Sequence, residues 1–345
     1  MLIVMKIGAT KQQILEVVQA IEGIGYIAKI SKGAQRSIIL VHGNIGYIDE
    51  SYFKKFSGIR DIIHISKRLK LVYKENAGGV DTLVDVGDGI VFNENYSHII
   101  AGPCSIESRE MIMETAEFLS SRGIRILRGG AFKPRTSPYS FQGLGEKGLE
   151  YLYEAAARYN MKTVTEAVDE YSLDLVKEVS HIIQIGARNM QNYSLLKKCG
   201  SVNKPVLLKR GFNASIDDLY ASIEYILSEG NPNIIVCERG IRIFEGRKQR
   251  SLIDFLGVAD FKEESHLPII IDASHATRDR SKVPALSRAA MAFGCDGLMV
   301  EVHPDPDKAL SDGPQSLSFN DFDLMLIELK KISAAFGKPI KLFKE

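Results

Sequence analysis

The sequence predicts an α/β protein in which a (β/α)₈ TIM barrel follows a small ferredoxin-like βαββαβ domain. From residue 98 onward, strand-like apolar segments alternate with helix-like segments eight times, over the roughly 250 residues that such a barrel usually takes. Most of these strands are apolar along their length, which is typical of a parallel sheet buried on both faces. Residues 1–75 follow the order strand, helix, strand, strand, helix, strand, which is the ferredoxin-like order.

The first 75 residues supply the elements of the small domain. Residues 2–7 form an apolar strand, and the next helix is predicted to begin with a capping box of Thr10 and Gln13 and to end at Gly23. Its apolar residues recur at helical spacing: Ile14, Val17, Val18 and Ile21. The unit is completed by strands at 26–31 and 36–42 around a turn at Gly33, a short helix at 49–56 and a strand at 59–66.

This domain is basic, but its pattern does not favour nucleic-acid binding. Residues 1–75 hold 12 Lys and Arg against 6 Asp and Glu, a net charge of +6, whereas the remainder holds 32 against 37 and carries −5. RNA-binding versions of this order need aromatic side chains on the third strand. Residues 36–42 have none. We therefore expect a small-molecule or docking role without a nucleic-acid partner, and a basic face that is solvated or meets the acidic remainder.

Residues 76–97 are predicted to form a linker and a β-hairpin, and residues 98–345 the catalytic barrel. The hairpin is expected to turn at Gly87-Asp88-Gly89. A last helix near residues 320–336 carries one apolar stripe and is expected to end at Gly337. The eight barrel strands are predicted at residues 98–104, 125–130, 162–167, 181–188, 204–210, 233–239, 267–275 and 297–303.

Composition excludes several classes of protein. Apolar residues make up 45% and charged residues 25% of the chain, which is ordinary for a globular protein. No apolar run reaches the ~18 residues of a membrane span. The first residues lack the basic segment and cleavage site of a signal peptide, so we expect a cytoplasmic protein with no membrane partner. The four cysteines, at 104, 199, 237 and 295, lack CxxC spacing, which argues against a zinc ribbon or a disulfide framework.

Positively charged side chains stand where four of the eight strands end. The carboxyl ends of TIM-barrel strands meet at one face, where function gathers. Cations that converge there repel each other unless an anion completes the cluster, and arginine suits phosphate and carboxylate oxygens. Any one of these bases, taken alone, is as well explained by a surface ion pair. The bases at or just beyond the strand ends are Arg128, Lys133, Arg135, Arg188, Lys209, Arg210 and Arg239.

Other strand ends carry potential metal ligands, namely Cys104, His275, Glu301 and, in the following loop, Asp312. A thiolate, an imidazole and two carboxylates suit one borderline divalent ion, such as Mn²⁺, Fe²⁺, Co²⁺ or Zn²⁺. With an open position, that ion would act as a Lewis acid. Single residues of these kinds are more often structural, and spacing does not choose between His275 and His303. Together with the bases, the pattern indicates a metal-assisted barrel enzyme that binds at least two anionic groups.

At these residues the chain resembles the 3-deoxy-D-arabino-heptulosonate 7-phosphate (DAHP) synthases, in the subgroup with a ferredoxin-like domain ahead of the barrel. The family condenses phosphoenolpyruvate with erythrose 4-phosphate and releases phosphate, which is the first step of the shikimate pathway to the aromatic amino acids. The matching stretches span residues 98–318 in order: AGPCSIES, LRGGAFKPRTSPYSFQG, TEAVD, IGARNMQN, LLKRG, CERG, DASH and VEVHPDPDKALSDGPQSL.

The resemblance implies roles for individual residues. Arg135 and Thr136 are the implied contacts of erythrose 4-phosphate, and Lys133 is the implied general acid. Independently of the resemblance, Glu166 near the end of the third strand is a candidate to support a lysine or to orient the substrate. The implied contacts of phosphoenolpyruvate are Arg128, Lys133, Arg188, Lys209 and Arg239. The implied ligands of one divalent metal ion are Cys104, Glu301, Asp312 and, in preference to His303, His275.

Two stretches depart from the family pattern. After DASH the family has a glycine and paired arginines, whereas this chain has Ala276-Thr277-Arg278-Asp279-Arg280-Ser281. The conformation of this loop and the roles of Arg278 and Arg280 are therefore left open. The segment after CERG, GIRIFEGRKQRSLIDF, also differs. The implied metal ligands and the bases at the strand ends are unaffected.

The resemblance also implies regulation by an aromatic end product. The small domain of this subgroup is regulatory, so we expect inhibition by tyrosine or phenylalanine across a subunit contact in a homotetramer. The alternative is a domain that serves only stability or assembly.

Two other functions are alternatives to this one. The sister enzyme, which makes 3-deoxy-manno-octulosonate 8-phosphate from arabinose 5-phosphate, is expected to have Lys-Ala-Asn-Arg where this chain has Lys133-Pro134-Arg135-Thr136. A non-catalytic sensor of phosphorylated metabolites is the alternative from a different class, and it would have no need of four metal ligands.

Overall fold

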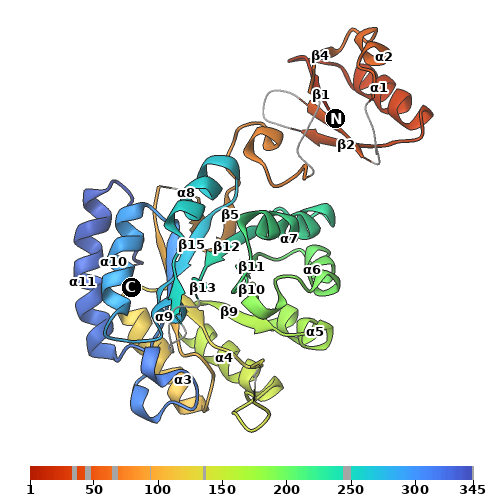
Figure 1. Cartoon of the computed structure of the whole chain (residues 1–345). Coiled ribbons are helices and arrows are strands. Elements are labelled where there is room, and N and C mark those ends of the chain that lie inside the picture. The colour runs from red at the N-terminus through yellow and green to blue at the C-terminus, as the bar shows by residue number, and fades with distance from the viewer. Residues whose placement is uncertain are drawn as a thin grey trace. The chain divides into compact units, whose positions relative to one another are not determined.

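The structure is a computed structural model, and it describes residues 1–32, 37–42, 48–63, 69–93, 95–134, 137–243 and 250–343, without the side chains of Lys32 and Arg250. The chain divides into two compact units, Met1–Lys70 and Leu71–Glu345. Figure 1 shows the elements of each unit, coloured along the chain. No helix among the described residues is long and apolar enough to cross a membrane.

The first unit is an antiparallel sheet covered by helices, in the strand order β2-β3-β1-β4 of the ferredoxin-like fold. The predicted capping box is present, because the Thr10 hydroxyl accepts from the N–H of Gln13 while the Gln13 side chain accepts from the N–H of Thr10. The predicted turn at Gly33 lies outside the described residues. The elements are β1 Leu2–Met5, α1 Lys11–Gly23, β2 Ile27–Lys32, β3 Ser37–His42, α2 Ser51–Lys54 and β4 Ile59–Ile63.

Side chains from both helices and the sheet form the core of this unit. Val17 and Ile21 of α1 are fully buried against Ile3 and Met5 of β1. Helix α2 is a single turn, shorter than the helix predicted at residues 49–56. Phe53, its one fully buried side chain, belongs to the same core cluster.

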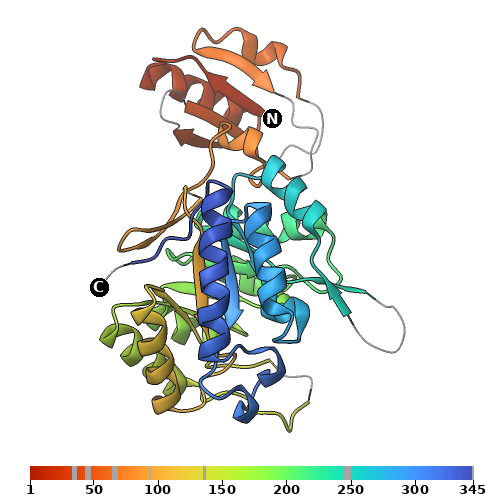
Figure 2. The same ribbon diagram turned by 90° about the vertical axis from the view of Figure 1, so that its left-hand side faces the viewer.

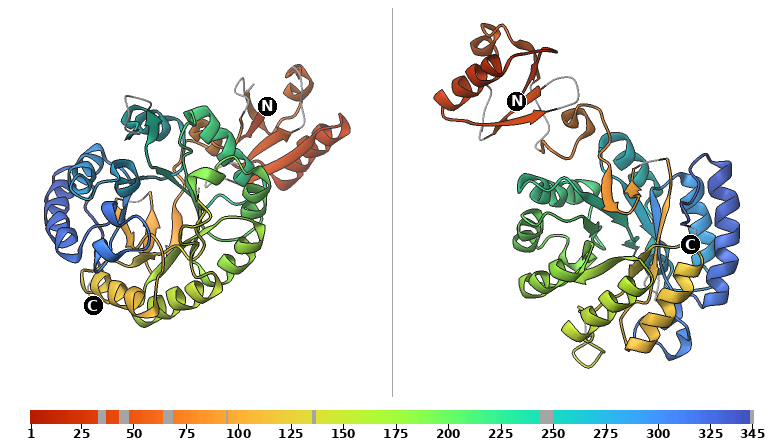
Figure 3. Two further views of the ribbon diagram at one scale, coloured as in Figure 1. Left: turned by 60° about the horizontal axis from the view of Figure 1, so that its bottom comes forward. Right: turned by 180° about the vertical axis from the view of Figure 1, so that it is seen from behind.

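The second unit is a closed barrel of eight parallel strands, as predicted, with helices around it. Figure 3 shows the helices as a ring outside the strands. Every barrel strand lies within a segment predicted to be one, although most end sooner. In spatial order the strands are β7 His98–Gly102, β8 Ile126–Arg128, β9 Lys162–Ala167, β10 Ile182–Ile185, β11 Val206–Lys209, β12 Ile234–Glu238, β15 Ile269–Asp272 and β16 Gly297–Glu301.

The outer helices begin at side-chain caps in most cases. Ser108, Asp169, Ser215 and Ser318, for example, each accept a hydrogen bond from an N–H of the following helix. Figure 2 shows the last two helices packed side by side. The ring consists of α3 Arg109–Ser121, α4 Glu146–Arg158, α5 Glu170–Val179, α6 Tyr193–Gly200, α7 Ile216–Ser228, α8 Phe255–Glu264, α10 Val283–Phe293 and α11 Phe319–Ala335.

A hairpin of β5 Val84–Gly87 and β6 Ile90–Phe92 covers the amino-terminal end of the barrel. It turns at Asp88-Gly89, as predicted, and its buried side chains join the core formed inside the barrel by residues such as Ile126 and Ile182. Asp88 pairs with Lys162, the first residue of β9, at 2.8 Å. The barrel is therefore closed at this end, and its other end remains for binding.

Several short elements were not predicted. A second hairpin, β13 Ile241–Ile243 and β14 Arg250–Leu252, occupies the segment after CERG, and its tip lies outside the described residues. A five-residue helix, α9 Ala273–Thr277, follows β15 directly. The remaining pieces are 3₁₀ turns: η1 Lys74–Ala77, η2 Ala187–Asn189, η3 Pro306–Lys308 and η4 Gly313–Gln315.

Candidate active site and metal centre

The carboxyl ends of the barrel strands surround a cavity of about 520 Å³. A smaller pocket of about 50 Å³ adjoins it and shares Lys133, Arg188 and Arg239 with it. The small pocket is lined by five of the bases selected from the sequence: Arg128, Lys133, Arg188, Lys209 and Arg239. Bases that are more than a hundred residues apart in sequence thus come together around one space.

Four of these bases lie at or just beyond the ends of four different strands. Arg128 and Lys209 are the last residues of β8 and β11, and Arg239 follows directly after β12. Arg188 does not end a strand as predicted, because β10 stops at Ile185 and Arg188 lies in η2. The four elements meet because parallel strands of a closed barrel deliver their carboxyl ends to the same face.

Arg210 does not belong to the cluster, although the sequence placed it there. Its guanidinium pairs with Glu238 and Asp254, both at 2.9 Å. Successive side chains of a strand point to opposite faces, so Arg210 points away from the side that Lys209 faces. The predicted sugar-phosphate contacts Arg135 and Thr136 lie outside the described residues.

The deepest bases already have buried acidic partners. Arg128 lies 2.6 Å from Glu301, and Lys209 lies 2.6 Å from Asp272, with all four side chains at most 5% exposed. Arg239 is different, because its buried Nη1 has no hydrogen-bond partner among the described residues. Its guanidinium instead lies over the ring of Phe212, 4.5 Å from the centroid. Burial lowers the pKa of Arg239, and an anion in the pocket would restore the lost stabilisation of its charge.

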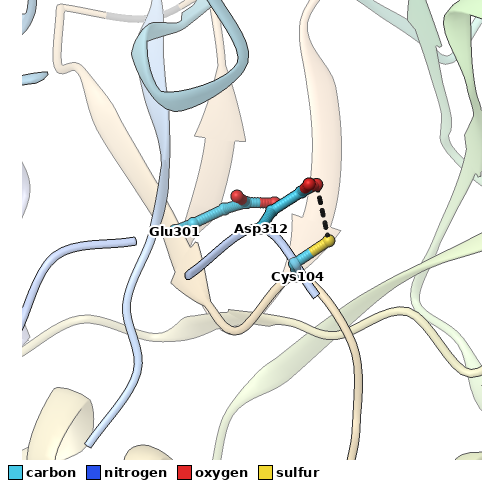
Figure 4. Close-up of side chains that lie close together, drawn as sticks. All are labelled: Cys104, Glu301 and Asp312. Atoms are coloured by element: carbon cyan, nitrogen blue, oxygen red, sulfur yellow. Dashed lines mark hydrogen bonds between the residues drawn. The ribbon is translucent and has the colours of Figure 1, made fainter. Parts of the chain in front are cut away.

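Three of the four predicted metal ligands form a compact group. The Sγ of Cys104 and carboxylate oxygens of Glu301 and Asp312 all lie within 4.8 Å of one another. Figure 4 shows the three side chains converging, with a hydrogen bond of 3.1 Å from Cys104 to Asp312. Glu301 is the last residue of β16, Cys104 follows two residues after β7, and Asp312 lies in the loop after β16.

The fourth, His275, reaches the same group from a different element than predicted. It does not end the seventh strand, because β15 stops at Asp272 and His275 lies in α9. Its Nε2 is 3.4 Å from Glu301 and 3.9 Å from Asp312. Its Nδ1 is 2.7 Å from a carboxylate oxygen of Asp272, and its Nε2 faces the group.

His303, the competing histidine, lies elsewhere. Its Nε2 is 3.5 Å from Glu107, and its Nδ1 accepts a hydrogen bond from the backbone N–H of Asp305 at 3.0 Å. Both ring nitrogens thus face other groups, and the geometry singles out His275.

The donor set fits a divalent ion. Ligands that lie about 2.0–2.3 Å from one ion are separated from each other by about 3–4.5 Å. Three pairs have this spacing: Cys104 to Asp312 at 3.1 Å, His275 to Glu301 at 3.4 Å and His275 to Asp312 at 3.9 Å. Burial and the neighbouring Glu301 raise the pKa of the Cys104 thiol to about 12, so a bound cation is what would make it a thiolate. Burial would raise the pKa of Glu301 too, but His275 and Arg128 lower it to about 2 and keep it ionised.

Lys133 joins the two halves of the site. Its Nζ donates to the carbonyl oxygen of Cys104 at 2.9 Å and lies 3.1 Å from the Cys104 sulfur. Burial alone would lower the pKa of Lys133, but Cys104 and Glu166 raise it above its ordinary value. The amine is therefore protonated, next to both the metal ligands and the small pocket. Glu166 lines the same pocket and accepts a hydrogen bond from Gln184.

Two supporting residues escaped the sequence analysis. Asp272 touches both Lys209 and His275, and the N–H of His275 donates to its second oxygen at 3.0 Å. Gln315 donates to Glu301 at 2.7 Å and lines the cavity. A signal existed for Asp272, since an acid at the end of the apolar run IIID has to be paired when buried. No comparable signal marks Gln315 in its loop.

Comparisons with known proteins relate both units of the chain to DAHP synthases. Residues 80–336 match the DAHP synthetase I family, and residues 1–67 match the DAHP synthase ferredoxin-like domain. A phospho-2-dehydro-3-deoxyheptonate aldolase of Thermotoga maritima is 51% identical, over 99% of this chain and all of that protein. A crystal structure of that DAHP synthase superposes with a TM-score of 0.78 at 50% identity, over 99% of both chains.

Two other relatives cover a smaller share of this chain. A truncated form of the Thermotoga maritima enzyme superposes with a TM-score of 0.72 at 52% identity, over 78% of this chain and 98% of that one. A 2-dehydro-3-deoxyphosphooctonate aldolase of Francisella tularensis is 33% identical, over 72% of this chain and 94% of that protein.

Proposed function

Because the chain belongs to the DAHP synthetase I family, we propose that it is a metal-dependent DAHP synthase, which condenses phosphoenolpyruvate with erythrose 4-phosphate at the carboxyl end of its barrel. One observation carries the proposal: five bases line a small pocket directly beside a group of Cys, His, Glu and Asp side chains. Phosphoenolpyruvate carries a phosphate and a carboxylate, and both suit such a pocket.

The bases would hold phosphoenolpyruvate by its two anionic groups. Arg239 and Arg188 are the best candidates for the phosphate, since neither pairs with an acid among the described residues. Arg128 and Lys209 keep their ion pairs to Glu301 and Asp272, and they have further N–H groups with which to bind oxygen. Because phosphoenolpyruvate would be held at both its phosphate and its carboxylate, its C3 carbon would have one orientation toward the second substrate. This orientation lowers the entropic part of the activation barrier.

A divalent ion held by Cys104, His275, Glu301 and Asp312 would supply Lewis-acid activation of the aldehyde. The protonated amine of Lys133 is the proposed acid, since it can deliver a proton to the aldehyde oxygen as C3 forms the new bond. Water then adds to C2, and cleavage of the C–O bond releases inorganic phosphate from the resulting tetrahedral carbon. The arginines would stabilise the negative charge of the phosphate as it leaves.

The second substrate could be either of two sugar phosphates, erythrose 4-phosphate or arabinose 5-phosphate. The octulosonate 8-phosphate synthases act on arabinose 5-phosphate and are related to this barrel, but the match to the DAHP synthase ferredoxin-like domain favours erythrose 4-phosphate. A phosphate-release assay with phosphoenolpyruvate and each aldose phosphate tests this directly. We expect turnover with erythrose 4-phosphate that is lost on chelation and restored by a divalent ion. Equal or greater turnover with arabinose 5-phosphate, or full activity after chelation, would contradict the proposal.

We also propose that the first unit binds an aromatic amino acid, tyrosine or phenylalanine, and that this binding lowers the turnover of the enzyme. The proposed assembly is a homotetramer, and the proposed location is the cytoplasm. The support is the match of residues 1–67 to a domain associated with DAHP synthases. Repeating the phosphate-release assay with each aromatic amino acid is the test. If none of the aromatic amino acids changes the rate of phosphate release, the first unit has a structural role only.

A further inference from the structure

Arg278 has a backbone conformation that is unfavourable for its side chain. Its φ is 54° and its ψ is 23°, which is the left-handed region. Asp and Asn adopt this region with little penalty, whereas a long side chain there is unusual and often marks a functional site. Among the described residues, the other non-glycine residues with positive φ are all of the tolerant kinds, namely Asp88, Asn93, Asn160 and Asp312.

The surrounding structure fixes this conformation. Arg278 ends α9, and its N–H donates to the carbonyl of Ser274 at 2.9 Å. Two residues later, the N–H of Arg280 donates to the carbonyl of Pro314 at 2.8 Å, in the loop that carries Asp312. The arginine is thus held between the helix of His275 and the loop of Asp312, at the rim of the catalytic cavity.

Within the part of the chain that the structure describes, no acid pairs with Arg278. It lines the large cavity but not the small pocket that adjoins it. Its charge also acts on Arg239, whose pKa is lowered by burial and further by Arg278. Two hydroxyl side chains, Ser137 and Ser140, line the same outer space. An unpaired guanidinium with nearby hydroxyl donors is suited to a phosphate group.

We propose that Arg278 binds the phosphate group of the aldose phosphate at the mouth of the cavity. This inference rests on the proposed function, because it takes an aldose phosphate as the second substrate. The aldehyde end of that substrate must reach the small pocket to react with phosphoenolpyruvate. Its phosphate, at the opposite end of the molecule, then lies in the outer cavity, where Arg278 is.

The test is the variant Arg278→Gly in the full-length enzyme. Glycine adopts the left-handed conformation freely, so the variant should melt no lower than the parent. We expect its KM for erythrose 4-phosphate to rise about 10- to 100-fold, as for the loss of a charged hydrogen-bonding partner, with the KM for phosphoenolpyruvate unchanged. Arg278→Lys, which retains the charge, should recover part of the loss.

Arg280→Ala is the matched control. Arg280 lies in the same loop, but it pairs with Asp307 at 2.5 Å and does not line the cavity. Both KM values should stay at the parental level in this variant. An Arg278→Gly enzyme with an unchanged KM for erythrose 4-phosphate, or with a raised KM for phosphoenolpyruvate alone, would overturn the role of Arg278. A parent enzyme that turns over no aldose phosphate would instead overturn the proposed function, and this inference with it.

Discussion

Asp272 touches two residues with different proposed tasks, a base of the small pocket and a metal ligand. One of its oxygens lies 2.6 Å from Lys209 and 2.7 Å from His275. Burial would raise the pKa of Asp272, but His275 and Lys209 lower it well below the ordinary value. A carboxylate in this position fixes the orientation and tautomer of a ligating histidine.

We predict that Asp272→Asn weakens metal binding by about 10- to 100-fold, because the neutral amide no longer supplies a negative charge beside the ring of the ligating histidine. Competition between the metal-free protein and a chelator of known affinity measures the effect without an activity assay. Asp296→Asn is the control, since Asp296 is also buried and paired with a lysine, Lys338, but lies before β16 at the other end of the barrel. If both variants lose metal affinity equally, Asp272 acts through stability alone.

Individual residues differ in how far their positions could be predicted from the sequence. Strand-end residues such as Arg128 and Glu301 were predictable, because an apolar run followed by a charge marks the end of a barrel strand. Lys209 and Arg210 were treated alike, although adjacent strand residues face opposite sides. The α9 helix was missed because DASHAT continues an apolar run without glycine or proline, and it begins only where Asp272 caps it.

At the scale of elements, the β5–β6 hairpin stabilises the barrel from its amino-terminal end. Phe92 and Val84 are fully buried there. We predict that Phe92→Ala lowers the free energy of unfolding by about 3–5 kcal/mol, because it removes a buried aromatic ring. Leu83→Ala, in the same segment at a side chain 54% exposed, should change it by less than about 0.5 kcal/mol. Urea unfolding compares the two, and equal effects would mean that the hairpin does not pack as described.

His98, the first residue of β7, makes the stability of this end depend on pH. Its Nε2 donates to the carbonyl of Val91 at 2.9 Å, and burial lowers its pKa from 6.5 to about 4. Between these pH values the unfolded chain binds a proton at His98 that the folded chain does not. The contribution of this residue to stability is therefore complete above pH 6.5 and is lost as the pH falls toward 4.

We predict that His98→Gln removes this dependence. The wild-type free energy of unfolding should fall between pH 6.5 and 4.5 more steeply than that of the variant, by up to about 1.4 kcal/mol per pH unit. Urea unfolding of both proteins at several pH values measures the difference, in which the contributions of the other histidines cancel. Parallel pH profiles would show that His98 titrates normally in the folded protein.

Elements also differed in how well the sequence predicted them. The β5–β6 hairpin carried a Gly-Asp-Gly turn between apolar runs, and the last helix a long apolar stripe, so both were predicted close to their observed bounds. The β13–β14 hairpin was not recognised, because its strands are only three residues each and both include an arginine. Such strands are defined by their mutual pairing and not by burial, which leaves no periodic pattern.

At the scale of the whole molecule, the two units should separate in function. The second unit begins at Leu71, whose N–H and that of Val72 donate to the carboxylate of Glu224 in α7. We predict that a variant starting at Leu71 retains condensation activity and loses inhibition by tyrosine or phenylalanine. Initial rates with and without each amino acid are the measurement. If turnover and inhibition disappear together, the first unit is needed for the integrity of the enzyme.

The closed amino-terminal end has a consequence for the order of events at the other end. Since the hairpin covers the amino-terminal end in the part of the chain that the structure describes, we expect substrates and products to pass through the outer cavity. If phosphoenolpyruvate occupies the small pocket and the sugar phosphate the adjoining cavity, as proposed, we expect phosphoenolpyruvate to bind before the sugar phosphate. An excess of the sugar phosphate should then obstruct the passage and slow the enzyme, whereas an excess of phosphoenolpyruvate should not.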